Sequence, residues 1–236
     1  RLLSRGLGDV YKRQVNTPNK EINHDEIRRV EDAATVVQLP ANREIIQVFA
    51  RGYRLDGQEN IRDPLGMTGV RLEVDAHVVT ATSPAVRNLE RVMESVDIVA
   101  ADRLMSGIAA TNAVLGREQR EHGVALIDIG GGTTNLAVIE EGDLQHVAVL
   151  PVGGINLTND LAIGLRTDLD VAEKLKLAYS SGDTKKQIKF KTGKKEYSFE
   201  RDEVEMIMQA RLDELFEMVN DELDKIGRSG KLPGGV

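Results

Sequence analysis

Hydrophobic and polar residues alternate most clearly within residues 70–82, where the apolar Leu72, Val74, Ala76 and Val78 are separated by polar or charged residues. Such alternation predicts a strand with one buried face and one solvent-facing side. A second strand is expected over residues 44–55. Residues 22–37 show helical spacing instead, and Asn23 lies where it can cap that helix. Another helix is expected to begin at Ser83-Pro84.

From residue 96 onward, short apolar runs alternate with longer helical patterns. The apolar runs predict strands at residues 96–103, 124–129, 136–139 and 144–150, with short candidates at 188–191 and 196–199. The helical patterns predict helices over residues 106–121, after Gly153-Gly154, after a capping Asp168, and over residues 200–226.

Composition narrows the class of protein. The chain has 236 residues, of which 41% are hydrophobic, and a formal net charge of −7. An acidic balance gives no sign of general nucleic-acid binding, so no nucleic-acid partner is expected. Cysteine is absent and the four histidines are scattered, which leaves no thiolate or histidine metal site. No apolar run reaches the length of a membrane span, and a cytoplasmic protein is the default expectation.

The two ends of the chain differ from the rest. Residues 1–14, RLLSRGLGDVYKRQ, are basic and lack a clear period. They resemble a translated adapter, and we leave them out of the expected fold. At the other end, LPGGV stops directly after a glycine pair, as though a strand were about to begin. A fragment open at both ends is therefore expected.

The segment LIDIGGGTTNLAVI carries the main candidate chemistry. Its glycines open onto a second strand, whereas dinucleotide-binding and Walker-type loops open onto a helix. A backbone without Cβ atoms can bring several N–H groups close to one anion. Asp128 would repel a bare phosphate, but it suits a divalent cation held between carboxylate and phosphate. Thr133 and Thr134 would add hydroxyl donors. The alternative is a plain tight hairpin in which Asp128 caps its own turn.

The order of three segments resembles a known superfamily. IDIGGGTTNLAV, then PVGGINLTNDLA, then AEKLKLAYS is similar to the actin/chaperone/sugar-kinase ATPases. The segment YRLDGQENIRDPLGMTGVRLEVDAHVVTA further resembles the subdomain specific to the FtsA family of bacterial cell-division proteins. The resemblance implies an α/β, actin-like (ribonuclease H-like) ATPase fold, present in part, with an inserted α+β subdomain of the FtsA type.

This resemblance also implies an order of domains. Residues 15–96 would be the inserted, SHS2-like subdomain (1C), and residues 97–121 the end of the first actin-like subdomain. Residues 122–236 would be the second actin-like half (2A), with a small subdomain (2B) at about 182–230. The first phosphate loop is expected before residue 15, and the adenosine-binding glycines after Val236.

The cofactors implied by the resemblance are ATP and Mg²⁺. Asp128 would hold Mg²⁺ through water, and Glu173 and Lys176 would contact the ribose and adenine. The residues expected to grip the phosphates or admit the nucleotide are Gly130, Gly131, Gly132, Thr133, Gly153 and Gly154. For Glu173 and Lys176 the alternative is a solvated ion pair on a helix.

Two departures from the superfamily pattern affect the expected activity. Asn135 stands near the hydrolytic water, where efficient ATPases of this superfamily often have a carboxylate, and a carboxamide cannot act as a base. Ser106-Gly107 stands where many relatives have Glu-Pro. We therefore expect ATP binding with weak hydrolysis, and at most a slow ATPase.

The resemblance implies partners as well. The C-terminal peptide of FtsZ would bind the 182–230 subdomain, with Arg211 and Lys195 as candidate contacts; the alternative is a solvated hairpin on a core helix. Residues 15–96 would meet other division proteins or the next subunit of an actin-like filament. The membrane would be reached only through a C-terminal helix absent here, which implies the cytoplasmic face of the membrane at the division site. A pilus-assembly relative and a small-metabolite kinase remain as alternatives.

Overall fold

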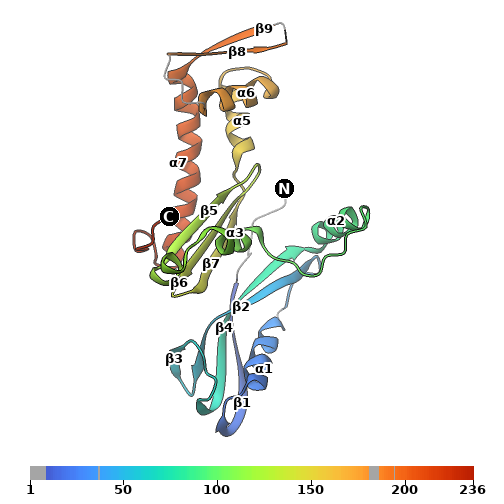
Figure 1. The fold of residues 1–236 in the computed structure, drawn as a ribbon, viewed down its shortest axis with the longest axis vertical. Helices are drawn as coiled ribbons and strands as arrows, with labels where there is room; N and C mark the ends of the chain where they lie inside the picture. The colour runs from blue at the N-terminus through green and yellow to red at the C-terminus, as the bar shows by residue number, and fades with distance from the viewer. Residues whose placement is uncertain (1–8, 37, 181–185, 194) are drawn as a thin grey trace. The chain divides into compact units, whose positions relative to one another are not determined.

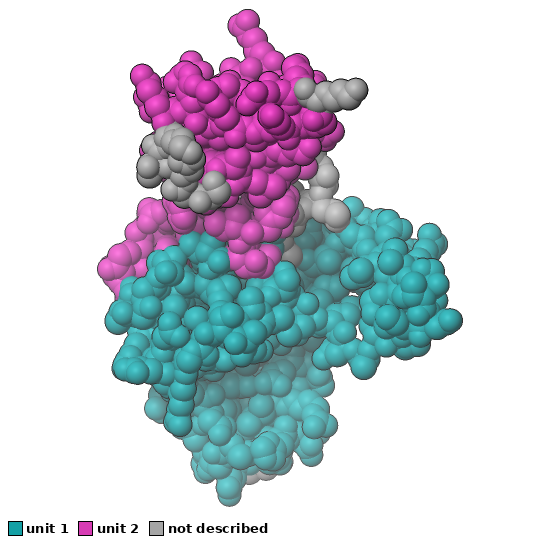
Figure 2. Space-filling view, turned by 45° about the horizontal axis from the view of Figure 1, so that its top comes forward, with its two compact units in different colours: residues 1–127, 136–149, 232–236 teal, residues 128–135, 150–231 magenta. Residues whose placement is uncertain are grey.

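The structure is a computed structural model that describes residues 9–36, 38–180, 186–193 and 195–236 (Figure 1). The chain divides into two compact units (Figure 2). Unit 1 comprises residues 1–127, 136–149 and 232–236, and unit 2 comprises residues 128–135 and 150–231. The first eight residues of the expected adapter tail, and residues 182–185 of the expected 2B subdomain, lie outside the described residues.

The first sheet of unit 1 has four strands in the order β1-β4-β2-β3. Its strands are β1 (Asp9–Glu21), β2 (Arg43–Leu55), β3 (Gln58–Ile61) and β4 (Thr68–Thr82). Each neighbouring pair is antiparallel. The alternation in the sequence predicts β2 and β4 correctly, and it does not predict β1 or β3.

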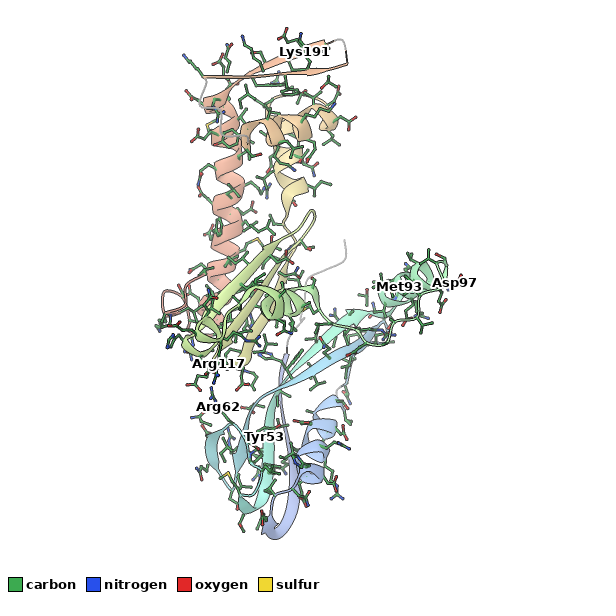
Figure 3. All side chains as sticks on the ribbon, in the orientation of Figure 1. Tyr53, Arg62, Met93, Asp97, Arg117 and Lys191 are labelled. Carbon is green, nitrogen blue, oxygen red and sulfur yellow. The ribbon has the colours of Figure 1, made fainter. Side chains whose placement is uncertain are left out.

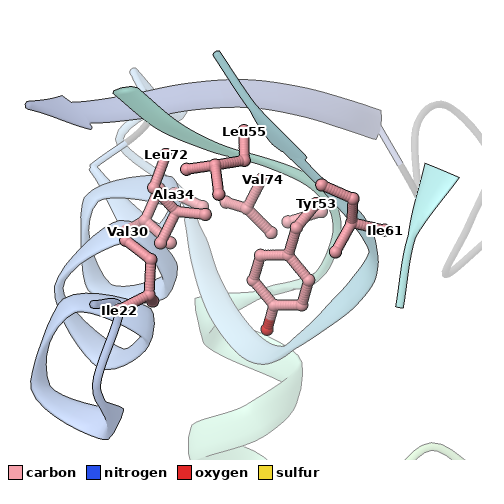
Figure 4. Close-up of a cluster of buried hydrophobic side chains, with 9 residues drawn as sticks. Ile22, Val30, Ala34, Tyr53, Leu55, Ile61, Leu72 and Val74 are labelled. Atoms are coloured by element: carbon pink, nitrogen blue, oxygen red, sulfur yellow. The ribbon is translucent and has the colours of Figure 1, made fainter. Parts of the chain in front are cut away.

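The core of this sheet follows from that alternation. Leu72, Val74 and Ala76 on β4 are buried, and they belong to one hydrophobic cluster with Val30 of α1 (His24–Thr35) and Tyr53 of β2 (Figure 4). The capping box predicted for α1 is also present: the Asn23 side chain accepts hydrogen bonds from the backbone N–H groups of Asp25 and Glu26. Local sequence signals therefore place both the helix and the strand that it covers.

Leaving residues 9–14 out of the fold was wrong for this structure. They form the first part of β1, where Asp9 pairs with Val78 and Gln14 pairs with Glu73. A strand edge presents unpaired N–H and C=O groups and accepts a neighbour without requiring a strict hydrophobic period, which explains why the pattern of this segment did not reveal it.

The strand predicted at residues 96–103 is not formed. The segment follows α2 (Ser83–Glu94) as turn and irregular backbone (Figure 3 labels Met93 and Asp97 on either side of the helix end), and the Val99 side chain is 90% exposed. A strand needs a neighbour for its backbone groups, and within the described ranges this segment pairs with none.

The helix predicted over residues 106–121 is split in two. It forms α3 (Ser106–Val114) and α4 (Arg117–His122), and Leu115 between them has an extended backbone. Gly116 then serves as the residue before α4. Glycine is a poor helix-interior residue, so the break occurs where helix propensity is weakest.

The second sheet has the order β5-β6-β7. Its strands are β5 (Val124–Ile129), β6 (Thr134–Glu140) and β7 (Asp143–Leu150), which confirms the three strands predicted for this region. Near the end of the chain, the backbone of residues 234–235 pairs with residues beside and within β5: Gly234 donates to Gly123 at 2.7 Å, and Gly235 accepts from Ala125 at 3.0 Å.

A buried histidine connects the two sheets within unit 1. His77 on β4 is 1% exposed, and its Nε2 lies 2.6 Å from the backbone oxygen of Gln145 on β7. Because a carbonyl oxygen only accepts, Nε2 carries the proton of the neutral ring. Burial lowers the pKa of His77 to about 4, since the charged ring would lose its hydration.

The described residues of unit 2 form three helices and a hairpin. The elements are α5 (Gly154–Gly164), α6 (Leu169–Ser180), β8 (Gln187–Thr192), β9 (Lys195–Glu200) and α7 (Arg201–Lys225). Side chains from all five elements form one hydrophobic core, including Leu161, Leu175, Ile188, Val204 and Phe199. Among the described helices, none combines the length and apolar character needed to cross a membrane.

Candidate phosphate-binding turn

The glycine segment forms the turn between β5 and β6, as predicted. The N–H of Gly130 donates to the oxygen of Thr133 at 2.8 Å and closes the turn. Thr134 begins β6, and its buried hydroxyl donates to the oxygen of Val152 at 2.8 Å. That hydroxyl is therefore committed within the protein, which corrects the expectation that Thr134 offers a free donor; Thr133 is partly exposed.

Neither backbone conformation nor packing explains Gly131 and Gly132. Neither residue adopts a left-handed φ, and a Cβ added to either would meet no atom within 4 Å. In the part of the chain that the structure describes, their N–H groups donate no hydrogen bond. Two consecutive exposed amides without side chains leave room and donors for an anion.

The beginning of α5 packs directly on this turn. The N–H of Gly154 donates to the oxygen of Gly130 at 2.9 Å, and that of Ile155 donates to the oxygen of Gly131 at 2.7 Å. A Cβ on Gly153 would lie 2.6 Å from the oxygen of Gly130 and 2.7 Å from the nitrogen of Thr133. Gly153 is therefore required by close approach of the two segments, since its φ of −161° is ordinary extended backbone.

Asp128 and Asn135 face each other across the base of the turn. The Nδ2 of Asn135 donates to Oδ2 of Asp128 at 3.0 Å. Asn135 is 9% exposed, and Asp128 is half-buried. The carboxylate keeps its second oxygen, so a single-carboxylate Mg²⁺ site completed by water and phosphate fits this donor set. The described residues contain no group of three or more acidic, histidine or cysteine side chains that could hold a metal ion.

Glu173 and Lys176 lie in one hydrogen-bonded cluster with the first turn of α5. The Nζ of Lys176 is 2.7 Å from Oε2 of Glu173, 2.9 Å from Oγ1 of Thr158 and 3.1 Å from the oxygen of Gly154. The hydrogen bonds from Lys176 and Thr158 hold the pKa of Glu173 below its usual value. Thr158 was not predicted, although it lies four residues after Gly154 and so on the same face of α5.

Arg211, predicted to contact a partner, lies in a groove between α5 and α7. The groove has a volume of about 410 Å³ and is lined by Asp160, Ile163, Gly164, Met206, Ile207, Ala210, Arg211 and Glu214. Both carboxyl oxygens of Asp160 accept from the Arg211 guanidinium, at 2.6 and 3.0 Å, and Glu214 also accepts from it. Asp160 thereby raises the pKa of Arg211.

The second predicted partner contact, Lys195, lies elsewhere in unit 2. It begins β9, and its Nζ sits 4.8 Å from the centre of the Tyr197 ring. It does not line the groove of Arg211. Lys191 of the same hairpin is labelled in Figure 3. Ser106 and Gly107 form the first turn of α3 in unit 1.

Comparison with known proteins covers most of the chain. Residues 8–80 match a family model described as "SHS2 domain inserted in FTSA", and residues 125–233 match "Cell division protein FtsA". The chain is 36% identical, over 226 residues, to cell division protein FtsA of Pseudomonas aeruginosa, and the match covers 92% of this chain and 54% of that protein. The chain spans about half the length of the curated relatives it matches.

Solved structures share the fold at low sequence identity. The PilM-PilN type IV pilus biogenesis complex matches 93% of this chain and 55% of the compared chain, with a TM-score of 0.61 and 16% identity. MreB 5 of Spiroplasma citri bound to AMPPNP matches 61% of this chain and 48% of its own, with a TM-score of 0.50 and 20% identity. These likenesses confirm the predicted actin-like fold.

Proposed function

The chain belongs to the FtsA family of cell-division proteins, and from this premise we propose that it binds ATP with Mg²⁺ at the Gly130–Gly132 turn as part of a division scaffold. The observation that carries the proposal is the state of Gly131 and Gly132. Their amides donate to nothing in the described chain, and their missing side chains leave open space. A triphosphate supplies the acceptors that such a turn lacks.

The neighbouring residues divide the binding task between them. Asp128 holds Mg²⁺ through water, and the metal neutralises part of the phosphate charge. Gly153 lets α5 approach the turn, and Thr133 adds a partly exposed hydroxyl. Glu173, whose side chain is 47% exposed, contacts the ribose or adenine. The structure of MreB 5 with AMPPNP supports a nucleotide ligand for this fold.

Hydrolysis is weak in this proposal. Asn135 offers a carboxamide, which cannot accept a proton from water, and its Nδ2 is directed to Asp128 at 3.0 Å. Ser106 and Gly107 supply no carboxylate either. ATP would then act mainly as a ligand that stabilises the folded, assembly-competent protein, as any ligand specific for the folded state does.

Binding and turnover test this assignment together. Calorimetric titration should show MgATP binding that weakens at least about tenfold in Asp128→Asn or when EDTA replaces Mg²⁺. Asp32→Asn, a change to an exposed aspartate on α1, is the matched control and should bind normally. ATP turnover should stay well below about 1 s⁻¹. Absence of binding by the full-length protein would contradict the assignment, and faster turnover would contradict weak hydrolysis.

The groove between α5 and α7 is the proposed site for the C-terminal peptide of FtsZ. Ile163 and Met206 line it with 77% and 68% of their surfaces exposed, which suits apolar side chains of a peptide. Arg211 can exchange Asp160 or Glu214 for a peptide carboxylate. In a peptide pull-down, Ile163→Glu should abolish capture. Leu177→Glu, at a 59% exposed position on α6 outside the groove, should not. Equal capture by both variants would exclude the groove.

The wider role follows from the same family. Through the FtsZ peptide the protein would link division filaments to the cytoplasmic face of the membrane at the division site. Self-association into actin-like filaments, and contacts of residues 15–96 with other division proteins, complete the proposal. The pilus-complex likeness, at 16% identity, reflects the shared fold.

A further inference from the structure

Lys176 has no hydrogen-bond donor left for a ligand in this structure. An ammonium group has three N–H donors. Its three acceptors lie within 3.1 Å and come from Gly154, Thr158 and Glu173. The side chain is 19% exposed, compared with 47% for Glu173. A direct contact with a nucleoside would require one of these hydrogen bonds to break.

Gly154 connects Lys176 to the glycine turn. Its carbonyl oxygen accepts from Nζ of Lys176 at 3.1 Å, and its N–H donates to the oxygen of Gly130 at 2.9 Å. Gly154 therefore accepts a hydrogen bond from Lys176 through its carbonyl oxygen and donates one to the glycine turn through its N–H. Thr158 is 5% exposed and accepts from the same ammonium, which ties α6 to the first turn of α5.

We infer that Lys176 is a positioning residue, which holds the start of α5 against the Gly130–Gly132 turn and so sets the geometry of the phosphate site, while Glu173 makes the nucleoside contact. This inference rests on the proposed nucleotide-binding function. Lys176 would then affect the binding of the phosphate groups of the ligand. Thr158 would contribute to the same effect, because its hydroxyl accepts a hydrogen bond from Lys176.

Two ligands separate positioning from direct contact. Mg²⁺-tripolyphosphate carries the phosphates of MgATP without ribose or adenine. In calorimetric titrations, Lys176→Met should lower the affinity for both ligands by the same factor, about tenfold for one lost charge-assisted hydrogen bond. Glu173→Gln should lower the affinity for MgATP and leave the affinity for Mg²⁺-tripolyphosphate unchanged. A selective loss of MgATP binding in Lys176→Met would overturn the inference and leave the proposed function intact. If the unchanged full-length protein bound neither ligand, the proposed function would fail and the inference with it.

A second pair of variants preserves the charge of Lys176. Thr158→Val removes the hydroxyl that accepts from the ammonium, and Thr158→Ser retains it. Without any ligand, amide hydrogen exchange at Gly154 and Ile155 should accelerate in Lys176→Met and Thr158→Val, and it should return to normal in Thr158→Ser. Unchanged exchange at these two amides in the Val variant, or no rescue by Ser, would overturn the inference even if Lys176→Met did not fold.

Discussion

The two hairpin turns of the β5-β6-β7 sheet use glycine for different physical reasons. Between β6 and β7, Glu141 and Gly142 both adopt a left-handed φ, of 56° and 84°, as two-residue type I′ turns require. Between β5 and β6, Gly131 and Gly132 have no left-handed φ and no neighbour within 4 Å of a Cβ. The β6–β7 turn needs glycine for its own conformation. The β5–β6 turn instead has open space around its glycines and N–H groups that donate to no described residue.

The surroundings of the two turns differ in the same sense. The N–H groups of Glu141 and Gly142 donate to the oxygens of Glu121 and Arg120, and Arg62 forms an ion pair with the Glu141 carboxylate at 2.9 Å. All these partners belong to unit 1. The amides of Gly131 and Gly132 donate to no described residue. The backbone donors of the β6–β7 turn are therefore satisfied within unit 1, whereas those of Gly131 and Gly132 have no acceptor among the described residues.

Lowering the pH should have the largest effect on stability, and it should act in unit 1, which contains the β6–β7 turn. His77, which holds the backbone of β7 through Gln145, has its pKa lowered to about 4, against an ordinary value of 6.5. As the pH falls from 6.5 to 4, the unfolded chain takes up a proton that the folded chain does not, so stability is lost across this window. The loss should reach about 3 kcal/mol in urea unfolding. His77→Leu has no such proton to bind, and the same pH-dependent loss in this variant would refute the assignment.

A methyl group at Gly153 should produce the next largest effect. Gly153→Ala places Cβ within 2.8 Å of three backbone atoms of the glycine turn, so the start of α5 must move away. We expect a loss of about 2 kcal/mol in unfolding free energy, together with loss of MgATP binding. Gly116→Ala is the matched control, because its nearest contact would be an ordinary 3.5 Å. Equal stability of the two variants would show that the packing of α5 on the turn is dispensable.

Alanine at one glycine of each turn compares the two directly. Gly142→Ala should cost about 1 kcal/mol of stability, because alanine resists a left-handed φ, and should leave MgATP affinity unchanged. Gly131→Ala should change stability by less than about 1 kcal/mol and weaken MgATP about tenfold, because its methyl group enters the space assigned to phosphate. Urea unfolding and calorimetry on both variants provide the measurements. If both lost only stability, the β5–β6 turn would be an ordinary hairpin.

Much of the fold could be predicted because its signals are local. The capping box of Asn23 and Glu26 and the alternation in β4 each lie within a few residues, and both are present in the structure. The same holds for the glycine turn between β5 and β6. The strand predicted at residues 96–103 was wrong, because a strand needs a neighbouring strand to pair its backbone groups. A local sequence pattern does not show whether that neighbour is present.

The sequence by itself determined that a glycine turn follows a buried strand and Asp128, and that a carboxamide, Asn135, follows this turn. Only the tertiary structure decided what each glycine is for. Gly153 touches Gly130, 23 residues away, and Lys176 reaches Gly154 from the next helix. Periodicity and caps depend on hydrogen bonds a few residues apart, whereas these contacts exist only once the packing of α5 and α6 has brought distant backbone groups together.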